Sequence, residues 1–352
     1  MRRLVVVALV AMVLGLAVAA TLIWRAYTAP TDAPAARVEV VRGATLGDVA
    51  RDLTARGVLH HRRVFLLAAR LGGRDRTLPV GTFRIPAGAS PRDILEILLE
   101  APPEPVVVTL PEGLEASTMA GLVADSLGLD LAAILAVADS LVRARSGELM
   151  TDDERARLAM VIDSGPRPDG RPLHWCEGYL APDTYHFAEG SDALAVATAM
   201  VDLQVGRLAE ARARGRSPHA VLTLAALVEA EARRDDERAR IAAVYHNRLA
   251  RGMRLEADPT VAFWLGKRGE RLLYRDLEID SPYNTYRRSG LPPAPVLAPG
   301  AASIAAAAAP DADCRALYFV ADGDGGHVFS ETLAAHNRAV ARYRELMRER
   351  RR

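Results

Sequence analysis

Residues 224–237, LAALVEAEARRDDE, place two acids, Glu229 and Glu231, in a run of alanine, leucine and valine. The apolar residues recur at helical spacing, and Glu231 continues their stripe. The stripe consists of Leu224, Leu227, Val228 and Glu231. Glu229 lies two positions earlier, about 200° around the axis. The two acids therefore cannot share one face of the helix.

An acid on an apolar stripe predicts a functional carboxyl group. Burial disfavours the charged form, so we expect the pKa of Glu231 to be raised into the range useful for a general acid. The alternative is a helix residue in a salt bridge, because arginines lie close by in the sequence. These are Arg233, Arg234 and Arg238.

Further helices are predicted around this stretch, over 115–146, 192–215, 217–234 and 236–252, followed by a long loop-rich region. A strand pair is expected at 316–320 and 327–329, and a final helix from about Thr332. The intervening DGDGG turn at 322–326 lacks the later glutamate ligand of a calcium loop, so it is interpreted as a plain turn.

The region before residue 105 has the pattern of a small αβ module. Strands are predicted at 37–41 and 81–85, and Ser90 with Pro91 marks a helix start. Another strand, 106–110, follows the proline-rich stretch 101–105. We therefore predict an α+β fold in five parts. These are a cytoplasmic N-terminus and anchor (1–25), a linker (26–36), the module (37–104), a larger α+β domain (105–345) and a basic C-terminal tail (346–352).

The N-terminus predicts a membrane anchor. Two arginines precede the uncharged apolar run 4–24, which is about the length needed to span a bilayer. Basic residues before such a helix favour a cytoplasmic N-terminus. We therefore expect a single-pass protein of the cytoplasmic (inner) membrane, with the rest of the chain extracytoplasmic. A cleaved signal peptide, ending near Ala17, Ala19 or Ala20, is the alternative.

Charge and cysteine content narrow the range of partners. With 45 basic and 44 acidic residues, the net charge of +1 gives no reason to expect a nucleic-acid partner. Cys176 and Cys314 fit no metal-ligand spacing, and the eight histidines form no close pair except the adjacent His60 and His61. We expect neither a metal nor a cofactor. The sequence leaves open whether the two cysteines form a disulfide.

The loop 281–286, SPYNTY, has the composition of a sugar-binding segment. Aromatic rings can stack on sugars, and amide and hydroxyl groups give directional hydrogen bonds. A structural role for the loop is the alternative. The motifs NRL at 247–249 and DPTV at 258–261 lie shortly before it.

Seven motifs occur in the order found in the YceG-like (MltG) endolytic murein transglycosylases, and the chain resembles that family over nearly its whole length. They are EGYLAPDTY (177–185), LVEAE (227–231), NRL (247–249), DPTV (258–261), YNTY (283–286), GLPP (290–293) and the set YFV (318–320), GH (326–327) and HN (336–337). The small N-terminal module resembles the LysM-like domain of the same family.

The resemblance implies an enzyme that cuts nascent peptidoglycan strands internally, between N-acetylmuramic acid (MurNAc) and N-acetylglucosamine (GlcNAc). It places the catalytic acid at Glu231. Asp183, Tyr283, Asn284 and Tyr286 are expected to be substrate contacts, with a scaffolding role as the alternative. Peptidoglycan, the membrane and cell-wall synthases of elongation or division are the implied partners.

Such an enzyme needs a single carboxyl group. Glu231 would protonate the glycosidic oxygen and then take the proton of the muramic acid 6-hydroxyl, giving a 1,6-anhydro end without water. Two alternatives stay open. One is a catalytically weak scaffold for cell-wall synthases, and the other is a hydrolytic muramidase that uses a second carboxylate, either Asp183 or Asp258.

Three alanines depart from the family pattern. Ala230 and Ala232 stand where the family commonly has lysine and a hydroxyl residue, and Ala181 replaces an aromatic residue. These changes leave rate and specificity open but do not affect the acid itself. The role of Glu229 is also left open, and His327 and His336 are expected to be structural or to line the cleft.

Overall fold

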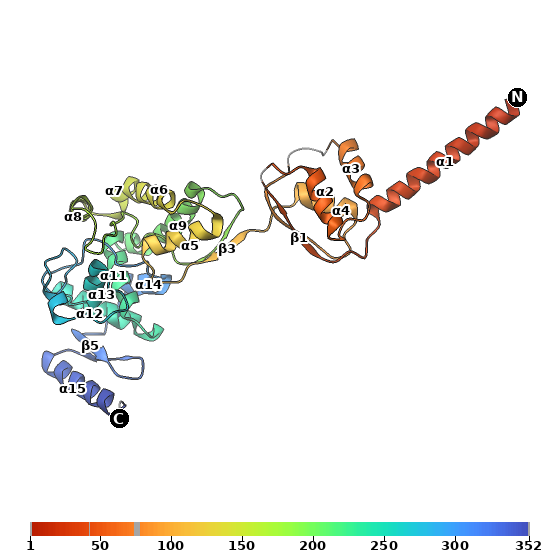
Figure 1. Cartoon of the computed structure of the whole chain (residues 1–352). Helices are drawn as coiled ribbons and strands as arrows, with labels where there is room; N and C mark the ends of the chain where they lie inside the picture. The colour runs from red at the N-terminus through yellow and green to blue at the C-terminus, as the bar shows by residue number, and fades with distance from the viewer. Residues whose placement is uncertain (1, 42, 74–77, 351–352) are drawn as a thin grey trace. The chain divides into compact units, whose positions relative to one another are not determined.

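The computed structural model describes residues 2–41, 43–73 and 78–350 and has a mixed α and β fold (Figure 1). Met1, at the predicted cytoplasmic end, and Arg351 and Arg352, in the predicted basic tail, lie outside these residues. The chain forms two compact units. The first is Met1–Val107 with His186–Ser191, and the second is Val108–Tyr185 with Asp192–Arg352.

Helix α1, Arg2–Thr28, is apolar enough and long enough to span a membrane. Its segment Val5–Thr28 has a mean hydropathy of 2.8, and its large apolar side chains are exposed. The helix ends three residues later than the predicted anchor.

The segment predicted as a linker is hydrogen-bonded to the first unit. The amide of Thr31 donates to the carbonyl of Gly88 at 3.1 Å, and its hydroxyl donates to the carbonyl of Ala89 at 3.0 Å. The amide of Gly88 donates in turn to the carbonyl of Ala33, which is buried. This part of the chain is therefore folded onto the unit that follows α1.

The first unit contains a two-stranded antiparallel sheet covered by helices. Strand β1, Ala36–Val40, pairs with β2, Gly81–Ile85, so that Val38 lies opposite Phe83. The helices are α2 (Leu46–Ala55), α3 (Arg62–Leu71) and α4 (Pro91–Glu100). A capping box formed by Ser90 and Asp93 starts α4, with Pro91 at its first position. The predicted strands and helix start are confirmed.

A second pair of strands lies where the chain passes from one unit to the other. Strand β3, Val106–Thr109, pairs with β4, Thr184–Phe187, and the hydroxyls of Thr109 and Thr184 are 3.0 Å apart. The sequence predicted β3 but not β4.

The second unit begins with a group of helices in which α6 packs against α5 and α9. Its members are α5 (Ala116–Leu127), α6 (Leu131–Ala144), α7 (Ser146–Leu149), α8 (Asp152–Asp163), α9 (Ala193–Arg207) and α10 (Ala209–Ala213). The single helix predicted over 115–146 is interrupted, because Gly128 has a positive φ of 65° and Asp130 caps the next helix. The sequence did not predict α8.

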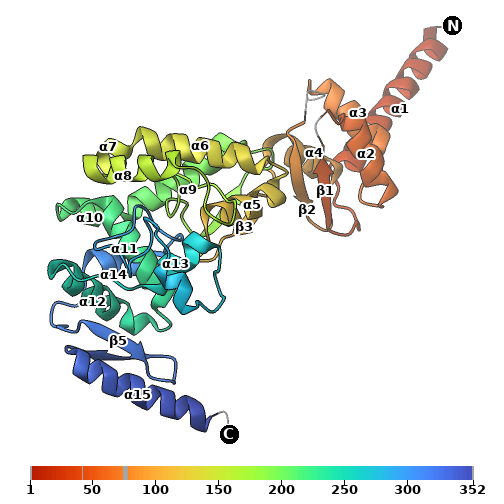
Figure 2. The same ribbon diagram turned by 60° about the vertical axis from the view of Figure 1, so that its left-hand side comes forward.

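The remaining helices surround α11, Pro218–Glu231, which packs against α12, α13 and α14 (Figures 1 and 2). These are α12 (Arg238–Ala250), α13 (Asp258–Leu265) and α14 (Ala301–Ala308), with short 3₁₀ helices η1 (Asp235–Glu237) and η2 (Tyr274–Glu278). The region predicted to be mostly loop therefore contains two α-helices. The C-terminal part is a hairpin of β5 (Tyr318–Ala321) and β6 (His327–Ser330), on which α15 (Leu333–Glu349) packs. The predicted hairpin is confirmed, and Thr332 caps α15 as expected.

Helix α11 is the central helix of this unit. Every residue from Val221 to Val228 is buried, so the helix has no solvent-facing side over two turns. The predicted stripe residues Leu224, Leu227 and Val228 are buried, and so are the residues between them. Neighbouring helices cover its faces over these two turns, and the last turn, which carries both acids, is partly exposed, chiefly at Ala230.

Candidate active site

Glu231 is the last residue of α11. The helix starts at Ser217, whose hydroxyl accepts a hydrogen bond from the amide of Ala220, and Pro218 occupies its first turn. At Ala232 the backbone becomes extended, with φ −69° and ψ 126°, so the helix ends three residues before the predicted boundary. Glu231 therefore lies at the C-terminal end of a buried helix.

The surroundings of Glu231 favour its protonated form. Burial raises its pKa to about 7, the nearby charge of Asp258 adds to the rise, and Arg233 opposes it. The negative end of the helix dipole acts in the same direction as Asp258. Within the described chain, the Glu231 carboxyl forms no hydrogen bond or salt bridge. The raised pKa expected from the sequence is confirmed.

Two hollows meet at Glu231 and Asp258. The smaller hollow has a volume of about 290 Å³ and the larger about 500 Å³. The smaller is lined by Glu231, Tyr245, Arg248, Leu255, Glu256, Asp258, Tyr286, Phe319 and His336. The larger is lined by Ala230, Glu231, Asp258, Pro259, Ala262, Arg268, Gly269, Glu270, Arg271 and Leu272. The two acids thus separate two binding spaces of different composition.

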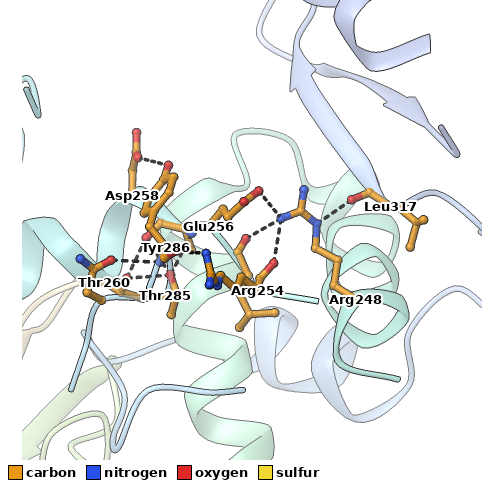
Figure 3. A network of polar contacts seen from close by, with 11 residues as sticks. Arg248, Arg254, Glu256, Asp258, Thr260, Thr285, Tyr286 and Leu317 are labelled. Atoms are coloured by element: carbon orange, nitrogen blue, oxygen red, sulfur yellow. Dashed lines mark hydrogen bonds and ion pairs between the residues drawn. The ribbon is translucent and has the colours of Figure 1, made fainter. Parts of the chain in front are cut away.

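Asp258, the first residue of α13, is held by Tyr286. The Tyr286 hydroxyl donates a hydrogen bond of 2.6 Å to Asp258 Oδ1 (Figure 3). Burial and this bond raise the pKa of Tyr286, so it is a protonated donor at neutral pH. The sequence named Asp258 only as a possible second carboxylate. Its position before Pro259, at the start of a short helix, is the signal that could have assigned it more firmly.

Thr285 joins the SPYNTY loop to the start of α13. Its hydroxyl accepts a hydrogen bond from the amide of Ala257 at 3.0 Å and lies 3.0 Å from the hydroxyl of Thr260. Its carbonyl accepts from the amide of Glu256 at 3.2 Å. These bonds explain how Tyr286 reaches Asp258 although 28 residues separate them in the sequence.

Arg248 organises the other side of the same network (Figure 3). Its guanidinium donates to the carbonyls of Leu317, Arg254 and Leu255 and forms an ion pair of 3.1 Å with Glu256. Glu256 has a positive φ of 51°, an unusual conformation for a residue with a side chain. The arginine of the NRL motif therefore holds the chain that leads into Asp258.

The C-terminal hairpin and α15 contribute one wall of the smaller hollow, through Phe319 and His336. The His336 ring stacks on Tyr318 with centroids 5.2 Å apart. Burial and the charge of Arg248 lower the pKa of His336, which is therefore neutral at pH 7. His336 lines the cleft, one of its two expected roles. His327 instead pairs with Glu237 at 2.8 Å, which is the structural alternative.

Three of the four expected substrate contacts line neither of the two hollows. Tyr283 is completely buried and stacks on Trp264, with centroids 5.6 Å apart. Asn284 is also buried, where its side-chain amide donates to the carbonyls of Leu277 and Ile279. Neither side chain is exposed in this structure, and both have the surroundings of the scaffolding alternative.

Asp183 does not line either hollow. Its carboxylate forms an ion pair of 2.6 Å with Arg207, and its carbonyl accepts a hydrogen bond from the amide of Leu110. Tyr286 alone among the four expected contacts lines a hollow together with Glu231.

Glu229 faces the core on the other side of α11. Its carboxylate accepts hydrogen bonds from Arg238 at 3.1 Å, from the amide of Gly300 at 3.1 Å and from the hydroxyl of Ser303 at 2.8 Å. Gly300 is the residue that caps α14. Glu229 therefore ties α11 to the first residue of α12 and to the start of α14. The prediction that the two acids face different sides is confirmed.

Both cysteines are free thiols, Cys176 buried and Cys314 partly exposed. Among the described residues, Asp139, His174 and Cys176 bring possible ligand atoms within 4.8 Å of one another. The sequence search missed this cluster because Asp139 lies 35 residues before His174. Asp139 already accepts a hydrogen bond from the amide of Cys176 and pairs with His174, so the cluster links α6 to the turn that carries these two residues after α8.

Comparison with known proteins gives consistent matches. The model of the YceG-like family matches residues 38–342. An endolytic murein transglycosylase of Bacillus subtilis (strain 168) is 42% identical over 175 residues, which are 48% of each chain. One of Streptococcus pneumoniae (serotype 2, strain D39) is 28% identical over 322 residues, which cover 87% of this chain and 58% of that relative.

The fold also resembles a solved structure. A crystal structure of a yceG-like protein from Listeria monocytogenes matches with a TM-score of 0.58 at 29% identity, and the match covers 86% of this chain and 98% of that one. By contrast, the matches to the two curated relatives span 48% and 58% of their lengths.

Proposed function

Because this chain belongs to the YceG-like family, we propose that it is an endolytic peptidoglycan lytic transglycosylase that cleaves the bond between MurNAc and GlcNAc. One observation carries the proposal. Glu231 has a pKa near 7, forms no hydrogen bond or salt bridge within the described chain, and lies where two hollows meet. A group that is half protonated near neutral pH can serve as acid and then as base.

The reaction requires one carboxyl group. Glu231 gives its proton to the glycosidic oxygen, the bond from that oxygen to C1 of MurNAc breaks, and GlcNAc leaves with a free 4-hydroxyl. The 6-hydroxyl oxygen of the same MurNAc then bonds to C1 and returns its proton to Glu231. The product carries a 1,6-anhydro end, the enzyme regains its starting state, and no water is consumed.

Asp258 and Tyr286 support this chemistry in two ways. The charge of Asp258 keeps the proton on Glu231 before the reaction, and it favours the positive charge that develops at C1 as the bond breaks. The hydrogen bond from Tyr286 fixes the direction of the Asp258 carboxylate. Preorganised charge of this kind needs no rearrangement during the reaction.

The two hollows support internal cleavage. An enzyme that cuts within a strand must bind sugars on both sides of the broken bond. The larger and smaller hollows provide such spaces on either side of the two acids.

The same proposal includes the layout of the chain. Residues 1–25 form a membrane anchor with its N-terminus in the cytoplasm, and 26–36 lead into a LysM-like module at 37–104. Residues 105–345 are the catalytic domain, and its last helix, α15, continues to Glu349 within the basic segment 346–352. The exposed apolar surface of α1 supports the anchor. The catalytic domain is then extracytoplasmic, where it meets nascent strands and cell-wall synthases of elongation or division.

Product analysis tests the proposal. Full-length protein in detergent is incubated with peptidoglycan strands beside its Glu231→Gln variant, and the fragments are analysed by mass spectrometry. We expect internal fragments with 1,6-anhydromuramic ends from the wild type only. No cleavage by the folded wild type would favour a binding scaffold instead.

A hydrolytic muramidase is the second candidate, because Asp258 lines both hollows together with Glu231. Such an enzyme would use Asp258 to activate water or as a nucleophile. It would leave reducing ends in place of anhydro ends, so the same experiment separates the two reactions.

A further inference from the structure

The two hollows differ in the cations that they offer to a ligand. Apart from the shared acids, the larger hollow is lined by Arg268, Arg271 and Glu270, which leaves one net positive charge. Both arginines are exposed, and within the described chain neither forms an ion pair. Their guanidinium groups are therefore available to bind an anion.

The smaller hollow has no such free cation among its described residues. Its one arginine, Arg248, is occupied by three carbonyls and by Glu256. His336, the other residue able to carry positive charge there, is kept neutral by burial and by Arg248. What remains for a ligand is the Phe319 ring and a set of neutral and acidic polar groups.

The two sugars of the substrate differ in charge. MurNAc carries a peptide on its lactyl group, and this peptide ends in carboxylates. GlcNAc carries only hydroxyl groups and a neutral acetamide. A planar guanidinium pairs well with a carboxylate, whereas a neutral sugar is bound by aromatic rings and directional hydrogen bonds.

We propose that the strand has a fixed direction across the site, with the peptide-bearing MurNAc in the larger hollow, where Arg268 and Arg271 bind its peptide carboxylates, and GlcNAc in the smaller hollow. This inference rests on the proposed function, since it assigns the two sides of the same scissile bond. It makes Arg268 and Arg271 specificity-determining residues. Both lie in the segment between α13 and η2, outside the motifs that carry the family resemblance.

Two exposed ion pairs give a moderate preference. Single exposed pairs contribute about 0.2 to 1 kcal/mol, so two of them correspond to a preference of about two- to thirtyfold. High salt screens such pairs and should reduce the preference.

The test compares two substrates that differ only in charge. One is a preparation of peptide-bearing glycan strands, and the other is the same preparation after carbodiimide and ammonia have converted its carboxylates to amides. The ratio of kcat/KM for the two is measured with full-length wild type and with the Arg268→Gln/Arg271→Gln variant. The matched control is Arg344→Gln/Arg348→Gln, which removes two exposed arginines from α15 that form no ion pair within the described chain.

We expect the wild type and the control to cleave the charged strands about two- to thirtyfold better, and the Arg268→Gln/Arg271→Gln variant to lose this preference. Cleavage of the amidated strands should stay within about twofold in all three proteins. In high salt the wild type should behave like the variant.

The remaining outcomes contradict the inference. An unchanged ratio in the variant, no preference in the wild type, or an equal loss on both substrates would each show that these arginines do not bind the peptide. Cleavage that still depends on Glu231 in those cases preserves the proposed function. Absence of any cleavage by the wild type overturns both.

Discussion

The two faces of the last turn of α11 carry the same functional group in opposite surroundings. On one face, the Glu229 carboxylate accepts hydrogen bonds from Arg238, Gly300 and Ser303. On the other face, Glu231 forms no hydrogen bond or salt bridge in the described part of the chain, and its strongest electrostatic neighbours include a second acid, Asp258. The two residues are only two positions apart.

This difference shows that the supply of donors, and not the residue type, separates an ion-paired carboxylate from a carboxyl group that keeps its proton to higher pH. Burial costs a carboxylate solvation energy, and hydrogen bonds or opposite charges offset that cost. Glu229 receives this compensation from α12 and α14. Glu231 does not, so it retains its proton to higher pH and can give it to a substrate.

The largest expected effect separates the two acids by activity. Glu231→Gln should lower turnover by about 10²- to 10⁴-fold, because the amide can neither donate nor recover the proton. Glu229→Gln should lower it less than tenfold, since its carbonyl oxygen still accepts from Gly300 and Ser303. Release of anhydro ends per unit time is the measurement. Similar losses in the two variants would remove the functional distinction between the faces.

Stability should rank the same residues in the opposite order. Glu229→Ala leaves Arg238, whose side chain is 13% exposed, without its buried partner. We expect a loss of about 3 kcal/mol in the free energy of unfolding, measured with urea. Glu231→Ala at pH 5 is the control and should cost less than about 1 kcal/mol. A smaller loss for Glu229→Ala than for this control would contradict the assigned roles.

The sequence predicted the raised pKa of Glu231, but only part of its cause. Its apolar neighbours and the distance from Glu229 around the helix are properties of local sequence, so the raised pKa could be predicted. The position of Glu231 at the end of the helix and the approach of Asp258 depend on tertiary contacts. Asp258 is 27 residues away, and no local pattern links it to Glu231.

The SPYNTY loop shows why the contacts were harder to predict. A loop has no helical or strand periodicity, so its sequence does not tell which side chains point inward. Tyr283 and Tyr286 are of the same type, yet one is buried against Trp264 and the other reaches Asp258. The missed helices α13 and α14 have eight residues each, barely two turns, and too few for a clear apolar pattern.

A pH-dependent change in stability should follow from the unpaired state of Glu231. Its folded-state pKa of about 7 exceeds the ordinary value of 4.5, so the folded protein binds the proton more tightly than the unfolded chain. The wild type therefore loses stability as the pH rises from 4.5 through 7. Glu231→Gln removes this loss and should be more stable than the wild type by about 3 kcal/mol at pH 8, and the difference should nearly vanish at pH 4.5. Urea unfolding at both pH values is the measurement, and an equal difference at both would rule out this origin.

The smallest effects should come from substitutions of Asp258 and Tyr286, which change the pKa of Glu231. Asp258→Asn removes a charge that raises the pKa of Glu231, so the fall of kcat/KM at alkaline pH should begin at lower pH. Tyr286→Phe removes the hydrogen bond to Asp258 but keeps its charge, so the fall should begin at slightly higher pH. At acidic pH, below the pKa of Glu231, both variants should retain activity within about tenfold of the wild type. Asp258→Asn could instead lose as much activity as Glu231→Gln at every pH. Asp258 would then take part in bond making itself, and the protein would be a hydrolase that uses two carboxylates in place of a lyase that uses one acid.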